Sequence, residues 1–535
     1  MLNRREFVSG AAAAMGSFAL RTKSSHSETP ARPNLIYIFA DELRYLSCGY
    51  AGDEHARTPN IDKLSVEGCN FRQAVSSTPL CSPYRGSLMT GKYQSSTGMV
   101  INELRLSPEH ETFGQALTKA GYHTGYIGKW HMWANQTGHH DLVKNGFIPP
   151  GSYRLGFDGL WEAYNFNHSY REWPYFQNDT TPHVLKEYEP DAQTDVAIRF
   201  VKDAAKNSSP FALFLSWGPP HSPWGWDNID PKFAELYRYT SLPRPPNFSL
   251  VTDSYGDRWQ RLPHDYDRLV DDWRRVYYAQ TANLDWNLGR LMQALDEAGL
   301  TEDTILVFTS DHGEMFGAHG RQGKTIFYEE AARIPFLMRW PAAIPRKSVS
   351  ETLLGTPDIM PTILSLMNIP IPSTVEGKDL SSHALGKGGS EPRVAHMQGL
   401  GATAAWTDGS EWRALRDHEY TYAIYHSDRK ELLFNHRRDA YQLVDLSGDR
   451  AFRATLEHYR TLSETWRKEQ NDTFEACTWY RDHWTKDRNI TQTATGVGQD
   501  LNALRQVTDK WFRHGVGQQH VKRQLTPTPT SITLD

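Results

Sequence analysis

Short apolar runs that end in polar or charged residues are the clearest pattern along this chain. Residues 34–40 (NLIYIFA) and 304–310 (TILVFTS) are too short for typical helices and are rich in β-branched and aromatic residues. Such continuous apolar runs are typical of strands buried on both faces of a parallel sheet. Residues 211–217 and 122–127 have the same character. We therefore predict four buried parallel strands.

Helical patterns precede two of these runs. Between residues 273 and 298, leucines at positions 284, 288, 291 and 295 recur at helical spacing, and Gly299 follows as a C-terminal stop. Residues 111–120 are likewise predicted to form a helix, which ends at Gly121 directly before the predicted strand at 122–127. Helices that alternate with buried strands favour the α/β class, with a large mixed, mostly parallel sheet flanked by helices.

A second, smaller domain is predicted after the composition shift at residues 386–390 (GKGGS). Residues 411–416, 420–425 and 431–435 read as short antiparallel strands, and residues 452–470 read as a helix. The predicted division is a catalytic domain over 31–388, a C-terminal α+β domain over 389–480, and an extension with a flexible tail over 481–535.

The N-terminus carries the pattern of an export signal. Arg4 and Arg5 precede Phe7 and a weakly apolar stretch over residues 8–20, which is shorter than the roughly 20 apolar residues of a membrane span. This start resembles a twin-arginine signal, so residues 1–30 are predicted to be a signal peptide and linker. We expect the twin-arginine export machinery as a partner, a periplasmic or secreted protein, and no stable membrane insertion after signal removal.

Charge and cysteine content narrow the possible functions. The net charge of −5 comes without a long basic run, which argues against a nucleic-acid partner. The chain has four cysteines, at positions 48, 69, 81 and 477, and they form no C-x-x-C pair. A disulfide framework is therefore not expected, although a single bond between Cys48 and Cys69 is compatible with the sequence.

Acidic residues follow two of the predicted strands directly. Asp41 and Glu42 end the first run, and Asp311 and His312 end the run at 304–310. Ligands of open α/β sheets gather outside the carboxyl ends of the strands. Carboxylate oxygens with one imidazole suit a hard divalent cation, and we expect one Ca²⁺ ion per chain.

Basic residues follow the other two strands. His221 comes after the run at 211–217 and a pair of prolines, and Lys129 and His131 follow the run at 122–127. A lone histidine is more often hydrogen-bonded or solvated than catalytic. Agreement among four strand ends favours one shared site.

Cys81 lies in the string CSPYRGSLMTG, in which Pro83 and Arg85 stand two and four positions later. At average amino-acid composition, a cysteine is followed by proline two positions later and arginine four positions later in roughly one case in 400. The string resembles the signature of the formylglycine-dependent sulfatases, which have an alkaline-phosphatase-like fold. The resemblance implies that a formylglycine-generating maturation enzyme converts Cys81 to 3-oxoalanine, an aldehyde whose hydrate attacks sulfur.

The resemblance extends over about residues 33–475 and assigns roles to individual side chains. Many family members read Asp-Asp at the first strand end and Asp-Asn at the second, where this chain has Asp41-Glu42 and Asp311-His312. These replacements put the geometry of the metal ligands in question, although both can still ligate. The resemblance implies the metal ligands Asp41, Glu42, Cys81, Asp311 and His312, and the catalytic residues Cys81, Arg85, Lys129, His131, His221 and Lys324.

The resemblance also implies a separate catalytic role for each of these residues. Lys129 and Lys324 would clamp the sulfuryl oxygens and stabilise the charge that develops on them. One hydroxyl of the hydrate would attack sulfur and form a covalent sulfo-enzyme, while His221 protonates the oxygen of the departing alcohol. His131 would then remove a proton from the second hydroxyl of the hydrate to expel sulfate, and Arg85 would hold the nucleophile in place.

The substrate is less sharply indicated. A sulfated polysaccharide or oligosaccharide is favoured by family analogy and export, and a small aryl or choline sulfate is the nearest alternative. A phosphonate or phosphate ester hydrolase of the same fold and a non-catalytic binder of sulfated glycans are more distant alternatives. Tryptophans near the predicted catalytic segments are candidate sugar-stacking platforms, although most of them are expected to pack in the core or on the surface: Trp133, Trp161, Trp173, Trp224 and Trp226.

Overall fold

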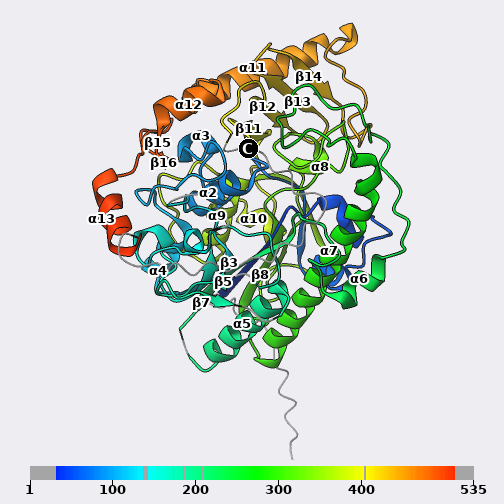
Figure 1. Ribbon diagram of the computed structural model, residues 1–535. Coiled ribbons are helices and arrows are strands. Elements are labelled where there is room, and N and C mark those ends of the chain that lie inside the picture. Colours follow the sequence, from blue (N-terminus) through cyan, green and yellow to red (C-terminus); the bar gives the residue numbers. More distant parts are fainter. Residues whose placement is uncertain are drawn as a thin grey trace, which may run out of the picture.

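An eight-stranded, mostly parallel sheet runs through the centre of the computed structural model (Figure 1). The structure describes residues 32–136, 142–172, 174–184, 187–207, 209–402 and 405–512. The strand order is β10-β2-β9-β8-β1-β7-β3-β4; β9 runs antiparallel to both neighbours, and the other pairs are parallel. The strands are β1 (Asn34–Asp41), β2 (Cys69–Val75), β3 (His123–Lys129), β4 (Leu160–Tyr164), β7 (Phe211–Pro220), β8 (Thr304–Ser310), β9 (Phe336–Arg339) and β10 (Ser348–Gly355).

Helices cover both faces of this sheet, because its central strands are apolar on both sides. In β1, Leu35, Tyr37 and Phe39 belong to one hydrophobic cluster, whereas Ile36 and Ile38 belong to another. Side chains alternate between the faces of a strand, so the two clusters lie on opposite sides of the sheet. The first cluster includes residues of α2 (Cys81–Thr90), α4 (Phe113–Lys119) and α9 (Thr356–Leu366), and the second includes residues of α1 (Pro59–Glu67), α5 (Glu189–Ala204) and α7 (Tyr266–Glu297).

The predicted fold class is confirmed, and all four predicted strands form within a few residues of their expected bounds. The long helix α7 begins at Tyr266 rather than at residue 273. Its first two turns are mostly polar, with Tyr266 and Val270 as the buried residues, so the leucine pattern does not reach them. Cys81 is the first residue of a helix, not part of a turn.

A four-stranded antiparallel sheet follows the large one. Three of its strands and the long helix α11 (Arg453–Glu469) confirm the predicted C-terminal elements, while β11 was not predicted. The boundary near residue 388 stays a prediction. In sheet order the strands are β11 (Ala395–Gly399), β12 (Trp412–Arg416), β13 (Thr421–Tyr425) and β14 (Glu431–Phe434).

The small sheet lies between α11 and the catalytic region. Leu415 and Tyr422 on one face pack with Leu456 of α11. Trp412, on the other face, packs with Phe327, a residue of the segment that follows Lys324. The C-terminal sheet therefore supports the segment that carries Lys324.

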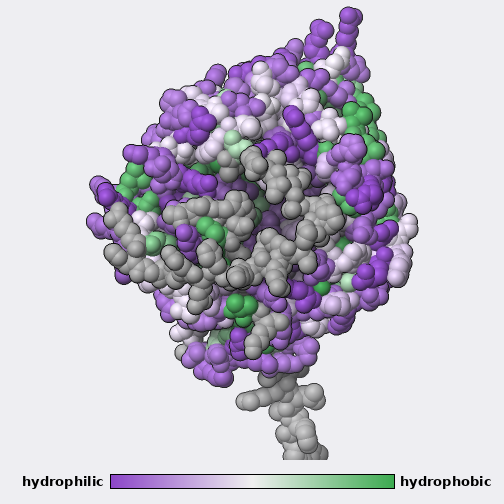
Figure 2. Space-filling model, viewed as in Figure 1, coloured by the Kyte–Doolittle hydropathy of each residue, from purple (hydrophilic) through white to green (hydrophobic). Residues whose placement is uncertain are grey.

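The remaining elements surround these two sheets, and the surface seen in Figure 2 is mostly hydrophilic. Within the described residues, the helices are too short or too polar to cross a membrane. Cys48 and Cys69 are buried and free, so they do not form the bond that the sequence allowed. The predicted signal peptide over 1–30 and the end of the predicted tail, from residue 513 onward, lie outside the described residues. The other elements are α3 (Gln94–Thr97), α6 (Pro231–Tyr237), α8 (Glu329–Ala332), α10 (Ser381–Ala384), α12 (Cys477–Trp484), α13 (Leu501–Phe512), β5 (Pro174–Tyr175), β6 (His183–Val184), β15 (Thr485–Lys486) and β16 (Asn489–Ile490).

Candidate active site

The sheet brings the predicted site residues together because their strands are neighbours. β1 pairs with β8 on one side and with β7 on the other, and β3 follows β7, all in parallel. The residues at and just after the ends of these strands therefore share one edge of the sheet. Asp41 and Lys129 are the last residues of β1 and β3, and Asp311 directly follows β8.

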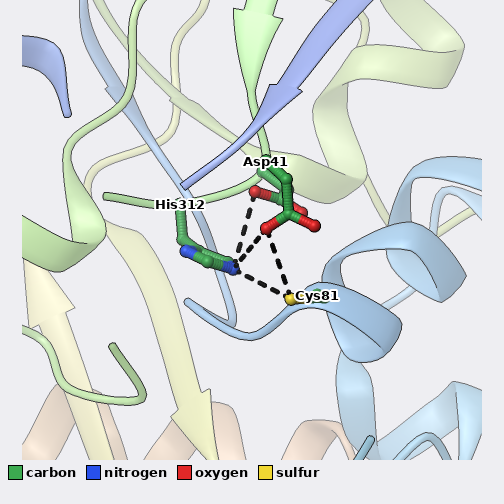
Figure 3. A group of neighbouring side chains, drawn as sticks. Asp41, Cys81 and His312 are labelled. Carbon is green, nitrogen blue, oxygen red and sulfur yellow. Dashed lines mark hydrogen bonds and ion pairs between the residues drawn. The ribbon is translucent and has the colours of Figure 1, made fainter. Parts of the chain in front are cut away.

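Four side chains converge at this edge with their donor atoms within 4.8 Å of one another: Asp41, Cys81, Asp311 and His312. His312 Nε2 lies 3.3 Å from Cys81 Sγ, 3.7 Å from Asp41 Oδ1 and 3.5 Å from Asp311 Oδ1. Figure 3 shows the side chains of Asp41, Cys81 and His312 pointing toward one another. Oxygen atoms from two carboxylates and one imidazole nitrogen form the centre of the cluster.

This donor set fits a divalent cation. The four residues are fully buried, and two buried carboxylates this close to one imidazole need positive charge nearby. His312 Nδ1 lies 3.0 Å from the carbonyl oxygen of Gly313, an acceptor, so the proton belongs on Nδ1 and the lone pair of Nε2 faces the cluster. Asp41, Asp311, His312 and the side chain at position 81 would hold the ion, and their oxygen-rich chemistry suits calcium.

Glu42, also predicted as a metal ligand, has its carboxylate in a different place. Its backbone is in the left-handed region, with φ of 72°, and its amide donates to Asp311 Oδ1 at 3.0 Å. The carboxylate instead lies 3.0 Å from His221 Nε2 and 3.3 Å from Lys324 Nζ. Burial raises the pKa of Glu42 well above its usual value, although Lys324 opposes the shift. Direct ligation by Glu42 stays a prediction.

The helix α2 presents Cys81 at its N-terminus. The preceding Leu80 has no side-chain cap, and the amide of Ser82 donates instead to Asn102 Oδ1 at 3.0 Å. Burial, reinforced by the carboxylate of Asp41, raises the pKa of the Cys81 thiol to about 12. Because the thiolate is the reactive form of cysteine, the unmodified thiol is a poor nucleophile at neutral pH.

Arg85 lies one helical turn after Cys81 and fastens α2 to the strand ends. Its Nη1 donates to the Lys129 carbonyl oxygen at 2.6 Å and to Ser216 Oγ at 2.8 Å. Its Nη2 lies 3.5 Å from Asp41 Oδ2 and 3.4 Å from Asp311 Oδ2. This buried guanidinium balances the negative charges of Asp41 and Asp311 and holds the helix that carries position 81.

Two lysines face the other side of the cluster. Lys129 Nζ lies 2.5 Å from Asp41 Oδ2, and Lys324 Nζ contacts His221 Nε2. Burial alone would raise the pKa of Asp41, but the positive charges of Lys129 and Lys324 outweigh it and hold the pKa well below its usual value. Asp41 therefore connects the candidate metal ligands with a group of cationic side chains that suits an anion.

His221 is neutral in this arrangement. Burial and then the positive charge of Lys324 lower its pKa well below the usual value. Its Nδ1 lies 2.8 Å from the carbonyl oxygen of Ser222, which places the proton on Nδ1. Nε2 thus accepts a hydrogen bond from the Lys324 ammonium, so the proton between the two nitrogens belongs to Lys324.

His131 follows β3 with a left-handed backbone, at φ of 54°. Its Nε2 lies 3.1 Å from Glu103 Oε1, and its carbonyl oxygen accepts from Ser82 Oγ at 2.6 Å. Burial raises the pKa of Glu103 to about 7, despite the opposing charges of Arg488 and Lys129. Glu103 was not predicted from the sequence, because it lies in a loop and no neighbouring motif indicates that its side chain contacts His131.

His168 is a second residue that sequence reasoning missed. Its Nε2 lies 3.2 Å from Lys129 Nζ, and its ring centroid is 3.8 Å from that of His221. Because an ammonium group donates only, His168 Nε2 acts as the acceptor. The histidine follows β4, a parallel strand at the edge of the sheet that was not predicted. Recognition of that strand would have placed His168 among the strand-end residues.

The sulfatase family model matches residues 33–369, which is more than half of the chain. This chain belongs to the sulfatase family. A second model, the C-terminal domain of N-sulphoglucosamine sulphohydrolase, matches residues 317–468. Family membership makes the protein a sulfuric ester hydrolase and agrees with the observed fold.

Relatives of this sulfatase match over most of their length. The ulvan-active sulfatase of Formosa agariphila is 34% identical over 430 residues, which are 79% of either chain. An endo-4-O-sulfatase of Bacteroides thetaiotaomicron is 29% identical over 518 residues, or 86% of this chain and 96% of the relative. The crystal structure of a Bacteroides fragilis protein assigned to the sulfatases has a TM-score of 0.73 and 31% identity, covering 85% of this chain and 98% of that one.

The tryptophans predicted as sugar platforms divide by burial. Trp133 and Trp161 of the sulfatase are 1% and 2% exposed and pack in the hydrophobic core, so neither can stack on a sugar. Both have the packing role that was expected for most of these tryptophans. Trp224 and Trp226 are half-buried, and Trp173 lies outside the described residues.

Proposed function

We propose that this sulfatase hydrolyses sulfate esters on a sulfated polysaccharide or its oligosaccharides, with one Ca²⁺ ion and an oxidised Cys81. The supporting observation is the convergence of Cys81, the Asp41–Asp311–His312 donors and two lysines at one edge of the sheet. The relatives named for ulvan and for the endo-4-O-sulfate position support a carbohydrate substrate. Ulvan is the polymer we propose to test first.

Two groups would complete this site. Oxidation of the Cys81 thiol to an aldehyde supplies, as the hydrate, an oxygen nucleophile in place of a thiol whose pKa is about 12. A bound Ca²⁺ supplies positive charge that stabilises the sulfuryl oxygens. The donor atoms of Asp41, Asp311 and His312 lie where they would hold that ion.

Lys129 and Lys324 would bind the oxygen atoms of the sulfate group. Both ammonium groups contact acids in the substrate-free arrangement, Lys129 at Asp41 and Lys324 at Glu42. An entering sulfate would share these cations, so their charges are already in place before the reaction begins. Such preorganised charge stabilises the transition state with little reorganisation.

Protons would move through two histidines. The pair of His221 and Lys324 holds one proton between their nitrogens, and His221 would pass it to the leaving alcohol oxygen. His131, oriented by Glu103 at 3.1 Å, would accept a proton from the nucleophile side. The two histidines thus serve opposite ends of the reaction.

We also propose that maturation precedes folding and export. Cys81 is only 1% exposed, so a maturation enzyme would reach its thiol only before α2 packs against the sheet. Twin-arginine export transfers folded proteins, which suits a chain modified in the cytoplasm. The Arg4-Arg5 pair supports this route and a periplasmic or secreted location.

Peptide mass spectrometry combined with sulfate release would test the proposal. Protein co-expressed with a maturation enzyme should show a loss of about 18 Da at Cys81, and should release sulfate from ulvan oligosaccharides. Cys81→Ala should release none. An unmodified Cys81 in fully active protein would disprove the nucleophile. Modified protein that releases sulfate from 4-nitrophenyl sulfate but from no sulfated glycan would disprove the carbohydrate substrate.

A further inference from the structure

A tight turn over residues 257–260 is built against the segment that carries Lys324. Asp257 Oδ1 accepts from the amides of Trp259 at 2.8 Å and Gln260 at 3.1 Å, which closes the turn. Gln260 points inward, and its Nε2 donates to the carbonyl oxygen of Lys324 at 2.9 Å. The turn is therefore attached directly to a residue of the active site.

Further hydrogen bonds fix the position of the turn. Gln260 Oε1 accepts from Arg321 Nη1 at 2.8 Å, and the amide of Gln322 donates to the Gln260 carbonyl oxygen at 3.0 Å. Gln322 Nε2 also donates to the carbonyl oxygen of Trp259 at 3.1 Å. Because the main chain on both sides of the turn is held, the side chains it presents outward have a defined position.

The same loop is attached to the C-terminal sheet. The ring of Tyr255 stacks on Tyr425 of β13, with centroids 3.8 Å apart and an interplanar angle of 10°. The hydroxyl of Tyr255 donates to Asp428 Oδ2 at 2.6 Å. The turn thus lies where the catalytic region meets the C-terminal sheet.

The outward side of the turn combines an aromatic ring with positive charge. Trp259 is 54% exposed, and the guanidinium carbon of Arg258 lies 5.4 Å from the centroid of its ring. Arg261 and His264 are exposed as well, and residues 258–264 (RWQRLPH) contain no acid. An exposed indole offers a flat apolar face, and arginine forms paired hydrogen bonds with sulfate and carboxylate groups.

We propose that Arg258, Trp259, Arg261 and His264, here called the Trp259 platform, bind the sulfated polysaccharide chain beyond the sugar that loses its sulfate. Trp259 directly precedes Gln260, whose side chain donates to the Lys324 carbonyl oxygen. Because neighbouring Cα atoms are about 3.8 Å apart, the main chain of Trp259 lies close to the segment that carries Lys324. A sugar ring would stack on the indole while neighbouring anionic groups pair with the arginines. The inference rests on the proposed function and extends it to the recognition of polymer length.

Two assays on matured, full-length protein would test the platform. Affinity electrophoresis in gels that contain ulvan measures binding without turnover, and sulfate release from ulvan fragments of increasing length measures kcat/KM. Trp259→Ala should weaken retardation by ulvan about tenfold, a typical loss for an aromatic residue at the centre of an interface. The ratio of kcat/KM on long fragments to kcat/KM on the shortest should fall by a similar factor. Trp259→Phe should recover most of both.

Tyr239→Ala is a matched control, because Tyr239 is an 89% exposed aromatic residue that follows α6. It should bind and hydrolyse like the wild type. Equal retardation and equal length preference in Trp259→Ala would overturn the platform. Loss of a dimer in Trp259→Ala on size-exclusion chromatography, with ulvan binding unchanged, would assign the surface to self-association and also overturn it. Failure of the wild type to release sulfate from ulvan, with Trp259-dependent retardation retained, would disprove the proposed substrate but not the platform.

Discussion

The ion pair between Arg416 and Glu329 should be among the strongest links between the C-terminal sheet and the catalytic region. Arg416 Nε and Nη2 contact Glu329 Oε1 and Oε2 at 2.6 and 3.1 Å, a two-point geometry. The two side chains are 1% and 7% exposed. Glu329 opens α8, shortly after Lys324 in the chain. We therefore predict that Arg416→Ala destabilises the fold and also weakens the position of Lys324.

The expected magnitude follows from burial and charge. Removal of one partner of a buried ion pair leaves an uncompensated charge, which costs about 3 to 5 kcal/mol. The pKa of Glu329 gives a second measure: burial alone would raise it, but Arg416 lowers it from 4.5 to about 2 with help from His436. That drop corresponds to roughly 3 kcal/mol. The two measures agree.

Thermal and urea unfolding of Arg416→Ala would measure this loss at pH 7. Arg460→Ala is the matched control, since Arg460 makes a similar two-point contact with Glu431, at 2.9 and 2.6 Å, in the same sheet region. The Arg460 side chain is 42% exposed, so its loss should cost less than about 1 kcal/mol. The free energy of unfolding should therefore separate the two variants by at least about 2 kcal/mol.

The pH dependence adds a further check. A carboxyl group whose pKa is lowered by folding contributes stability above its unfolded pKa and loses it as the pH falls toward the folded pKa. The contribution of Glu329 should be complete above pH 4.5 and disappear toward pH 2. The stability difference between wild type and Arg416→Ala should shrink over that window. Equal small losses in Arg416→Ala and Arg460→Ala at pH 7 would refute the reasoning.

Three other predictions concern the site and the leader. Addition of Ca²⁺ at 100 times its Kd to EGTA-treated protein should raise stability by about 3 kcal/mol, measured as an increase in Tm, and Asp311→Asn should abolish the increase; an unchanged increase would show that the ion binds elsewhere. Burial raises the pKa of Glu103 from 4.5 to about 7, so its ionisation costs the folded state roughly 3 kcal/mol above pH 7 and nothing below pH 4.5. Glu103→Gln should therefore raise Tm at pH 8 but not at pH 4, while kcat falls; a Tm gain that is equal at both pH values would contradict this reasoning. Replacement of Arg4 and Arg5 by lysine should retain the protein in the cytoplasm, measured by cell fractionation, and normal export would exclude the twin-arginine route.

The sequence was sufficient for the parts of the fold that depend on local pattern. Apolar runs placed β1, β3, β7 and β8, because strands buried on both faces need continuous apolar sequence. The polar residues that follow them could be assembled into one site, because parallel strands end at one edge of a sheet. The other four strands of the large sheet (β2, β4, β9 and β10) and strand β11 of the small sheet were not predicted, because strands that are short or mix polar with apolar residues carry little pattern of their own.

What the sequence could not supply was the pairing of side chains that are distant along the chain. Glu42 follows the predicted metal ligand Asp41, yet its left-handed backbone turns the carboxylate toward His221 and Lys324. Glu103 reaches His131 from a loop, and Gln260 reaches the Lys324 carbonyl from another. The chemistry of each predicted residue is thus set by a partner whose sequence position carries no sign of it. The strand ends position the candidate site, and residues of the loops between them, such as Glu103 and Gln260, provide the hydrogen-bond partners of His131 and Lys324.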